Sequence, residues 1–480
     1  MFLSLRYYNL ASHHVSLDGI KKILSISHYY PPFFHLSAVP IIFLFGFSED
    51  NLVLVNSFYL ILLVISTYGI GNILFNKRVG VLSSLLTMLY PIVFGLSREF
   101  LIDFALLSIV TAVIYLILKS KGGTKEPWNI FLGFTIGFTL LAKPIALIFF
   151  LPVLIYIFAR SFSINTKINN FLALFLTLII SFCICGGWYI EAFKDLTQIH
   201  LYWQNIAKTV EGDPQAFFSS FLWYKNALIN ALVSPKLFFF FLIGITLLIF
   251  SKERRKNIFL FITWTVPAFL LLILTPNKDG RYIMPALPVF ALITIAGIES
   301  IKKQIARNIS YFVVLVIGFV QFFNLSFNSK LHPSLLNIKP CYYNHTPLKQ
   351  EWKQKEILNF IYDRFGNRRI LIAVIPDCQY FNSLEFIYYG FLFKRPYRID
   401  DIGSSPITFK DLKKYDIFIT KYPDIAAGWT KLHREKFYNK VNKIGMKNLG
   451  YTKIFETELP DQSKACIYEK TGIFINNSRI

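Results

Sequence analysis

Hydrophobic residues run almost without interruption from Asn51 to Phe327, and the interruptions are short and polar. The run divides into about ten segments long enough to cross a bilayer, since a span needs roughly 20 apolar residues. A soluble core cannot bury so many helices that are apolar on every side. The pattern therefore predicts a polytopic α-helical membrane protein. The predicted spans are Leu52–Leu74, Val79–Leu96, Leu101–Leu118, Trp128–Leu141, Pro144–Ala159, Ile168–Ile190, Pro235–Phe250, Ile258–Thr275, Tyr282–Ile298 and Ile309–Ser326.

The loops between these spans alternate between basic and mixed charge. Basic loops stay on the cytoplasmic side of a membrane. The mixed loops, and everything after Ser326, are then predicted to face outward from the cytoplasmic (inner or plasma) membrane. One assignment satisfies every loop, with the cytoplasmic loops marked by Lys77, Lys121, Arg160, Arg254 and Lys303.

Because successive spans cross the membrane in opposite directions, the same assignment makes residues 1–51 external, although no span precedes them. Within them, Pro32–Phe47 is apolar but has only the length of an interfacial or re-entrant helix. Two interpretations stay open. Either this segment is a full span and the N-terminus is cytoplasmic, or the first membrane helix is missing from the sequence, which is the interpretation we favour.

The character of the chain changes after about Lys330. Short apolar runs bounded by charged residues and proline predict strands, and apolar residues at helical spacing predict helices between them. Alternating strands and helices indicate an α/β domain. The predicted strands lie in Asn367–Pro376, Tyr415–Thr420 and Ala465–Glu469, and the helices in Gln350–Phe365 and Ser383–Phe393. We therefore expect an external segment (1–51), a transmembrane domain (52–327) and an extracytoplasmic α/β domain (331–480).

The formal net charge of +22 arises from 50 Lys and Arg against 28 Asp and Glu. In a soluble protein this excess would suggest nucleic acid. Here the basic residues lie mostly in short loops, where they set topology, and we expect no nucleic-acid partner. The five cysteines show no CxxC spacing that would indicate a metal or redox site.

Polar side chains at the outward ends of the spans are the candidates for chemistry. Asp103 falls about one helical turn inside a span, where an ionisable group is costly and is by default a functional hypothesis. Arg98 and Glu99 stand at the start of the same span. The alternative is that Arg98 and Asp103 simply neutralise each other.

A second candidate site follows the span that ends near Thr275. Lys278 and Arg281 are external cations, which the charge bias of the loops disfavours, and an arginine fork suits phosphate oxygens. Gly280 permits close approach of a ligand to the backbone. Lys143 is a further external cation between two spans. These residues predict an anionic-headgroup site, and the alternative is snorkelling of the cations to lipid headgroups.

Two histidines flank the stretch Tyr29–Phe34, in which a pair of prolines suits the start of a helix. His28 and His35 are candidates for binding a metal or contacting an acceptor. A structural role is the alternative for each.

In this order, the motifs Tyr29–Phe34, Arg98–Asp103, Leu140–Pro144 and Lys278–Pro285 resemble those of the GT-C membrane glycosyltransferases. The similarity is greatest to the group of protein O-mannosyltransferases and lipid A aminoarabinose transferases. The resemblance implies a polyprenyl-phosphate-sugar donor, inverting transfer to a lipid, glycan or protein acceptor in the cell envelope, and room for a divalent metal. It implies catalytic roles for Asp103, Arg98 and Glu99, and donor-phosphate contacts for Lys143, Lys278, Arg281 and Tyr282.

The sequence departs from the family at its N-terminus. The first external loop of the family carries an acidic residue that is the usual candidate for the catalytic base, and no carboxylate stands at the matching place near Met1. Two other classes therefore stay open. A transporter would also have many spans, but transporters place ionisable groups near the bilayer midplane. A catalytically inactive assembly protein is the other alternative.

Overall fold

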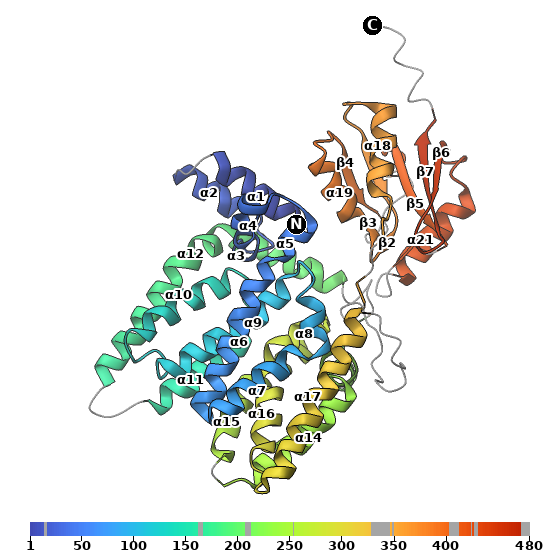
Figure 1. Cartoon of the computed structure of the whole chain (residues 1–480). Coiled ribbons are helices and arrows are strands. Elements are labelled where there is room, and N and C mark those ends of the chain that lie inside the picture. The colour runs from blue at the N-terminus through green and yellow to red at the C-terminus, as the bar shows by residue number, and fades with distance from the viewer. Residues whose placement is uncertain are drawn as a thin grey trace. The chain divides into compact units, whose positions relative to one another are not determined.

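The computed structural model describes residues 1–13, 17–161, 167–206, 213–252, 254–327, 346–347, 350–402, 412–423, 425–426 and 431–471. The chain divides into two compact units, a helical one formed mainly by residues 3–204 and 213–347 and an α/β one formed mainly by residues 348–480 (Figure 1). The helices of the first unit are α1 (Phe2–His13), α2 (Leu17–Ser25), α3 (Phe33–Ser37), α4 (Val39–Phe45), α5 (Glu49–Val53), α6 (Val55–Leu74), α7 (Lys77–Met88), α8 (Pro91–Leu96), α9 (Ile102–Lys119), α10 (Trp128–Leu140), α11 (Leu147–Arg160), α12 (Lys167–Ile206), α13 (Phe217–Ala227), α14 (Pro235–Phe250), α15 (Ile258–Leu274), α16 (Leu287–Ile298) and α17 (Gln304–Phe327).

Every predicted span contains an apolar helix, but not every helix has the length of a span. Among the described residues, six helices are long and apolar enough to cross a membrane. A seventh forms if α13 and α14 count as one span, although the chain bends by 105° between them. The other three predicted spans are shorter: α10 and α11 have 13 and 14 residues, and the predicted span Val79–Leu96 is split into α7 and α8. Pro91 explains the split, because a proline disfavours helical conformation in the residue before it.

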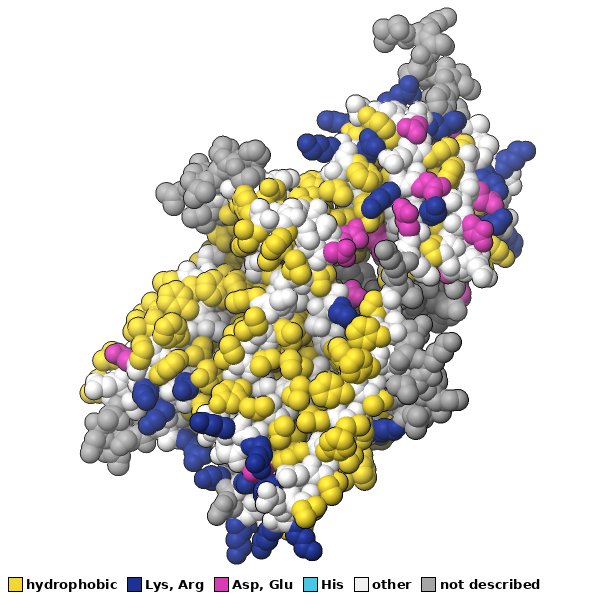
Figure 2. All heavy atoms as spheres, in the orientation of Figure 1, with side chains coloured by type: hydrophobic (Ala, Val, Ile, Leu, Met, Phe, Trp, Pro, Cys, Tyr) yellow, Lys and Arg dark blue, Asp and Glu magenta, His cyan; other side chains and the backbone are white. Residues whose placement is uncertain are grey.

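Three of the five basic loops meet at one end of the helical unit. Asn257 donates to the carbonyl of Leu74 at 2.9 Å, and Asn76 donates to Glu299 at 3.3 Å. Figure 2 shows lysines and arginines gathered at the lower end of the helical unit, whose surface above them is largely hydrophobic. These hydrogen bonds join three of the five predicted cytoplasmic loops, those marked by Lys77, Arg254 and Lys303, so these three lie at the same end of the helical unit.

The two most buried of the six spans lie at the centre of the unit. The apolar windows of α9 and of the segment Gly280–Ile298 are 72% and 83% buried, against 28–44% for the other four. The neighbouring pair α14 and α16 packs closely, since a Cβ on Gly297 would lie 2.1 Å from the carbonyl oxygen of Gly244. Small residues permit such approach between membrane helices. Asp103 and Arg281 lie at those ends of the two most buried segments that are opposite to the basic residues Lys119 and Lys303.

The apolar segment near the N-terminus forms two short helices, α3 and α4. Together they span Phe33–Phe45, which is shorter than a spanning helix. The segment is therefore as short as expected, but it is divided into two helices where one was expected. Tyr59 of α6 donates a hydrogen bond to the Ser37 hydroxyl at 2.7 Å and fixes the end of α3 against the spans.

The second unit is an α/β domain with one five-stranded sheet in the order β4-β1-β5-β7-β6. β4 (Arg398–Asp401), β1 (Leu371–Val374) and β5 (Ile417–Tyr422) are parallel, and β7 (Lys464–Lys470) and β6 (Tyr451–Glu458) complete the sheet antiparallel. The register pairs Leu371 with Arg398 and Ile417 with Glu469. A small hairpin joins β2 (Asp377–Cys378) to β3 (Phe381–Asn382).

Helices cover both faces of this sheet. Along β1, Ile372 and Val374 pack with α18 (Gln354–Phe365) and α19 (Ser383–Leu392), whereas Ala373 packs with α21 (Lys431–Ile444) on the other face. A strand buried on both faces is a continuous apolar run, which is why β1 and β5 were recognisable in the sequence. The predicted α/β character is confirmed.

Candidate functional site

Asp103 lies in the first turn of α9, two residues after the extended residue Leu101. Its side chain is only 3% exposed. A carboxylate in the first turn interacts favourably with the unpaired N–H groups of a helix. That interaction alone does not compensate for removing a charge from water, so a buried carboxylate requires cations beside it.

Lys143 provides the first of these cations. Its Nζ donates to Oδ1 of Asp103 at 2.8 Å. The residue lies in the turn after α10, and Pro144 starts the next helical turn. The ammonium also lies 4.6 Å from the centre of the Tyr282 ring, within the range of a cation–π contact.

Arg281 provides the second cation, at the other carboxylate oxygen. Its Nη1 lies 3.5 Å from Oδ2 of Asp103. Asp279 holds the same guanidinium, with its Oδ2 accepting from Nε at 2.9 Å and from Nη2 at 2.5 Å. The Oδ1 of Asp279 also accepts from the backbone N–H of Arg281 at 2.9 Å, which starts the helical turn Gly280–Ala286.

Three segments that are far apart in the sequence therefore meet in one cluster. We call Asp103, Lys143, Asp279, Arg281 and Tyr282 the outer cluster. Its two cations and two carboxylates balance each other, and the side chains of Lys143 and Arg281 are 23% and 24% exposed. The structure thus brings together three of the four predicted phosphate-binding residues, Lys143, Arg281 and Tyr282, and the side chains of the two cations are partly exposed.

Lys278 is engaged elsewhere. Its Nζ donates to the carbonyls of Ile273, at 2.8 Å, and of Thr275, which are unpaired groups at the C-terminal end of α15. Its backbone N–H donates to Oδ2 of Asp213 at 2.7 Å. Burial lowers the pKa of Lys278 and raises the pKa of Asp213. The prediction that Lys278 joins the other cations in one phosphate site does not agree with this geometry. The ammonium of Lys278 binds the nearby carbonyls at the end of α15 instead.

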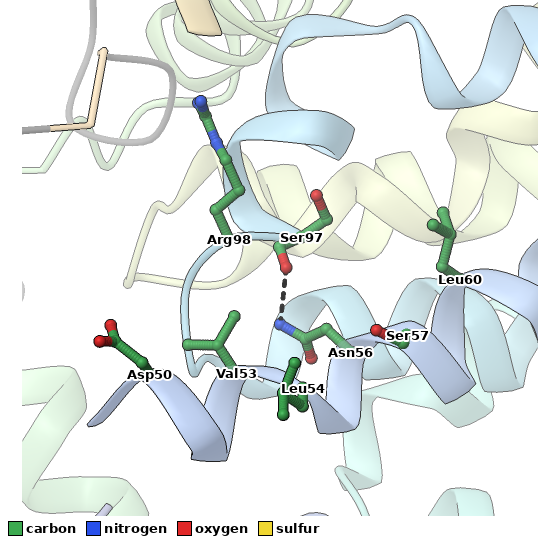
Figure 3. Close-up of a pocket in the computed structure, with 8 residues that line it drawn as sticks. All are labelled: Asp50, Val53, Leu54, Asn56, Ser57, Leu60, Ser97 and Arg98. Carbon is green, nitrogen blue, oxygen red and sulfur yellow. Dashed lines mark hydrogen bonds between the residues drawn. The ribbon is translucent and has the colours of Figure 1, made fainter. Parts of the chain in front are cut away.

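Arg98 and Glu99 do not hold Asp103. The ion pairs of Asp103 run to Lys143 and Arg281, so the alternative in which Arg98 neutralises Asp103 is wrong. Arg98 instead lies over the Phe94 ring at 5.8 Å and lines a cavity next to α6 (Figure 3). The carbonyl of Glu99 accepts from Asn56 at 2.8 Å.

His28 and His35 contact different residues. Nδ1 of His28 lies 2.5 Å from Oδ2 of Asp195 in α12. Nδ1 of His35 lies 3.4 Å from the hydroxyl of Ser4 in α1. Within the described ranges, no group of three or more His, Cys, Asp or Glu side chains is arranged to hold a metal ion.

Two carboxylates, one within the outer cluster and one beside it, were not among the predicted site residues. Asp279 orients Arg281, and Asp213 anchors the backbone of Lys278. Asp279 had a local signal, because an Asp two residues before a cation offers both an N-terminal cap and an ion pair. Asp213 had none, since 65 residues separate it from its partner.

Comparison with known proteins gives two kinds of similarity. Residues 30–188 match the family described as dolichyl-phosphate-mannose-protein mannosyltransferase. ArnT from Cupriavidus metallidurans bound to undecaprenyl phosphate is similar in structure, with a TM-score of 0.54 and 13% identity over 97% of this chain and 92% of that chain. The archaeal oligosaccharyltransferase AglB from Archaeoglobus fulgidus, in complex with an inhibitory peptide and a dolichol-phosphate, is also similar in structure. Its TM-score is 0.51, with 12% identity over 94% of this chain and 67% of that chain.

The match to ArnT in the apo state covers 71% of this chain and only 61% of that chain, with a TM-score of 0.48 and 14% identity. No curated protein matches the sequence significantly. At these identities the similar structures establish the fold alone. The family match covers residues 30–188, in the N-terminal part of the chain. The resemblance seen in the sequence is thus confirmed: the chain has the fold of the GT-C glycosyltransferases, and part of it matches a family of membrane mannosyltransferases.

Proposed function

We propose that the protein is a membrane glycosyltransferase that takes a sugar from a polyprenyl-phosphate donor and transfers it to a cell-envelope acceptor outside the cytoplasm. The observation that carries the proposal is the outer cluster. Two cations from separate loops converge on one buried carboxylate at the end of the helical unit opposite to the basic loops. ArnT and AglB, which share the fold, were solved with undecaprenyl phosphate and dolichol-phosphate.

The chemistry of such a transfer requires cations at the leaving group. The acceptor oxygen attacks the anomeric carbon, the bond between that carbon and the phosphate oxygen breaks, and the electron pair leaves with the polyprenyl phosphate. Negative charge grows on the phosphate in the transition state, and fixed cations that face it lower the barrier. Arg281 offers a fork for two phosphate oxygens and Lys143 a point charge beside it.

In this proposal Asp103 is a positioning residue and not the group that takes the acceptor proton. Both of its oxygens are already engaged by Lys143 and Arg281. A carboxylate stabilised by two cations is a weak base. Its role is to hold the cations a fixed distance apart while their exposed faces remain available to phosphate.

The divalent metal expected from the sequence remains part of the proposal. Glu99 is an exposed carboxylate on the connection that leads to α9, and it stays a candidate for contact with the acceptor. A transporter is less well supported, because the charged residues of the outer cluster lie at the ends of the spans and not near their middle.

The experiment is a turnover assay in membranes that contain the full chain. A polyprenyl-phosphate-sugar pool carrying a labelled sugar is supplied, and loss of label from the lipid is followed. Wild-type protein is expected to release the label, and Arg281→Ala to reduce release by at least about 100-fold, the typical cost of removing one electrostatic contact to the transition state. Lys225→Ala is the matched control, because Lys225 is an exposed cation in α13. Equal release by Arg281→Ala and Lys225→Ala would contradict the proposal.

A further inference from the structure

We propose that the cavity next to α6 binds the zwitterionic headgroup of a phospholipid that carries a primary ammonium, with an acyl chain along the exposed face of α6. The cavity has a volume of about 380 Å³ and lies between α5–α6 and the connection from α8 to α9 (Figure 3). Sites for small molecules have volumes of roughly 300–1,000 Å³. The inference does not rest on the proposed glycosyltransferase activity.

One acidic and one basic side chain line the cavity. Asp50 projects from α5 and Arg98 from the opposite connection, so the two side chains lie apart in Figure 3. Asp50 is exposed and has no ion-pair partner in the part of the chain that the structure describes. An arginine binds phosphate oxygens and a carboxylate binds an ammonium group. A ligand with both groups can contact the two side chains at once.

A neutral acceptor at the same place favours a ligand that donates hydrogen bonds. Asn56 lines the cavity and is only 2% exposed. Its Nδ2 donates to the carbonyls of Ser97, at 3.1 Å, and of Glu99, at 2.8 Å, which fixes the orientation of the amide. Its Oδ1 is enclosed and has no hydrogen-bond partner. Buried polar atoms without a partner are rare in proteins. A small movement of the cavity wall would let an N–H donor reach this oxygen.

An apolar stripe continues from the cavity along α6. Leu54 lines the cavity, and Leu54, Phe58, Ile61 and Ile65 are 44%, 59%, 59% and 55% exposed. Their spacing of four, three and four residues places them on one face of the helix. At 1.5 Å per residue the stripe is roughly 16 Å long, which is long enough to contact a large part of an acyl chain. A charged pocket above an apolar stripe fits a lipid better than a water-soluble ligand.

The same features discriminate among headgroups. A phosphocholine carries phosphate and a cation but no N–H to donate. A phosphoglycerol has hydroxyls to donate but places no cation near Asp50. Free phosphate would engage Arg98 alone. The cavity therefore predicts a preference for phosphoethanolamine over its methylated forms, and for these over phosphoglycerol.

The test measures lipid binding to the full chain by native mass spectrometry after exchange into a detergent with defined lipid. The probes are phosphatidylethanolamine, its N-methyl and N,N-dimethyl derivatives, phosphatidylcholine and phosphatidylglycerol with matched chains, and inorganic phosphate. We expect affinity to fall stepwise by about tenfold in total from phosphatidylethanolamine to phosphatidylcholine, equivalent to about 1.4 kcal/mol. Equal affinity across the methylation series, or displacement of the lipid by inorganic phosphate at similar concentration, overturns the inference.

Two variants locate the site. Asp50→Asn should remove the preference for phosphatidylethanolamine, because the neutral amide no longer attracts the ammonium. Glu49→Gln is the matched control, because Glu49 is the neighbouring carboxylate of α5 and does not line the cavity. An unchanged preference in Asp50→Asn, or its loss in both variants, places the lipid elsewhere. The comparison of lipids on wild-type protein stands even where a variant fails to fold.

Discussion

The ammonium of Lys143 lies 2.8 Å from the carboxylate of Asp103, although 40 residues separate the two in the sequence. The contact joins the turn after α10 to the first turn of α9. Arg281 completes it from a third segment. The cations are thus pre-positioned before any ligand arrives, which is the arrangement that makes electrostatic stabilisation efficient.

Asp103→Asn should lower turnover by about 100-fold or more while the affinity for the donor changes less than about tenfold. The amide no longer holds the two cations, and displacement of a charged group by about 1 Å can cost about 100-fold in rate. Kinetics with the labelled donor separate the two effects. Partial rescue by Asp103→Glu together with an unchanged pH profile supports the positioning role, whereas a shifted pH profile would show that Asp103 takes the acceptor proton.

Asp279→Asn should weaken donor binding by about 3- to 10-fold. The variant keeps an acceptor for the backbone N–H of Arg281 but loses the charge that holds the guanidinium. Glu299→Gln is the control, because Glu299 also faces an arginine, Arg307 at 3.8 Å, at the opposite end of the helical unit. A loss of the same size in both variants would point to general destabilisation instead.

Lys278→Met should lower the free energy of unfolding by about 1–3 kcal/mol, the cost of leaving buried acceptors unpaired. The variant keeps the length of the side chain but removes the donor to the last carbonyls of α15. Thermal unfolding in detergent gives the stability, and titration with undecaprenyl phosphate gives the affinity. Unchanged affinity with reduced stability agrees with the structure. Reduced affinity with unchanged stability would instead indicate that Lys278 contacts the phosphate.

Asp213→Asn should stabilise the protein more at pH 7 than at pH 4. Burial raises the pKa of Asp213 in the folded state above its usual value near 3.8. Between these two values the folded chain binds more protons than the unfolded chain, so the contribution of Asp213 to stability is lost as the pH rises. The amide still accepts from the N–H of Lys278. Melting curves of both proteins at the two pH values test the sign, and a variant less stable than wild type at pH 7 contradicts it.

The sequence was most informative where one physical rule dominated. Asp103 was recognisable because a carboxylate one turn inside a span is costly. The apolar strands β1 and β5 were recognisable because both of their faces are buried. Polar edge strands gave no such signal: β4 reads Arg-Ile-Asp-Asp, and β6 has one buried residue among exposed and partly buried ones. Both were missed, as was the polar helix α21.

Side-chain partners were less predictable than elements. The sequence placed Lys143, Lys278 and Arg281 on one side of the membrane, and the structure joins Lys143 and Arg281 through Asp103. Lys278 differs because helix carbonyls lie within reach of its ammonium. Such a choice between a local and a distant partner depends on positions of a few ångströms, which loop charges and motif order do not specify.

The most direct test of the account compares the binding of undecaprenyl phosphate with that of undecaprenol, which lacks the phosphate, in wild-type protein and in the double variant Lys143→Gln, Arg281→Gln. The account predicts that wild-type protein binds the phosphate form at least about tenfold more tightly, a difference of about 1.4 kcal/mol, and that the double variant binds both lipids alike. A double variant that keeps the full preference for phosphate would contradict the central claim that the outer cluster holds the phosphate of the donor.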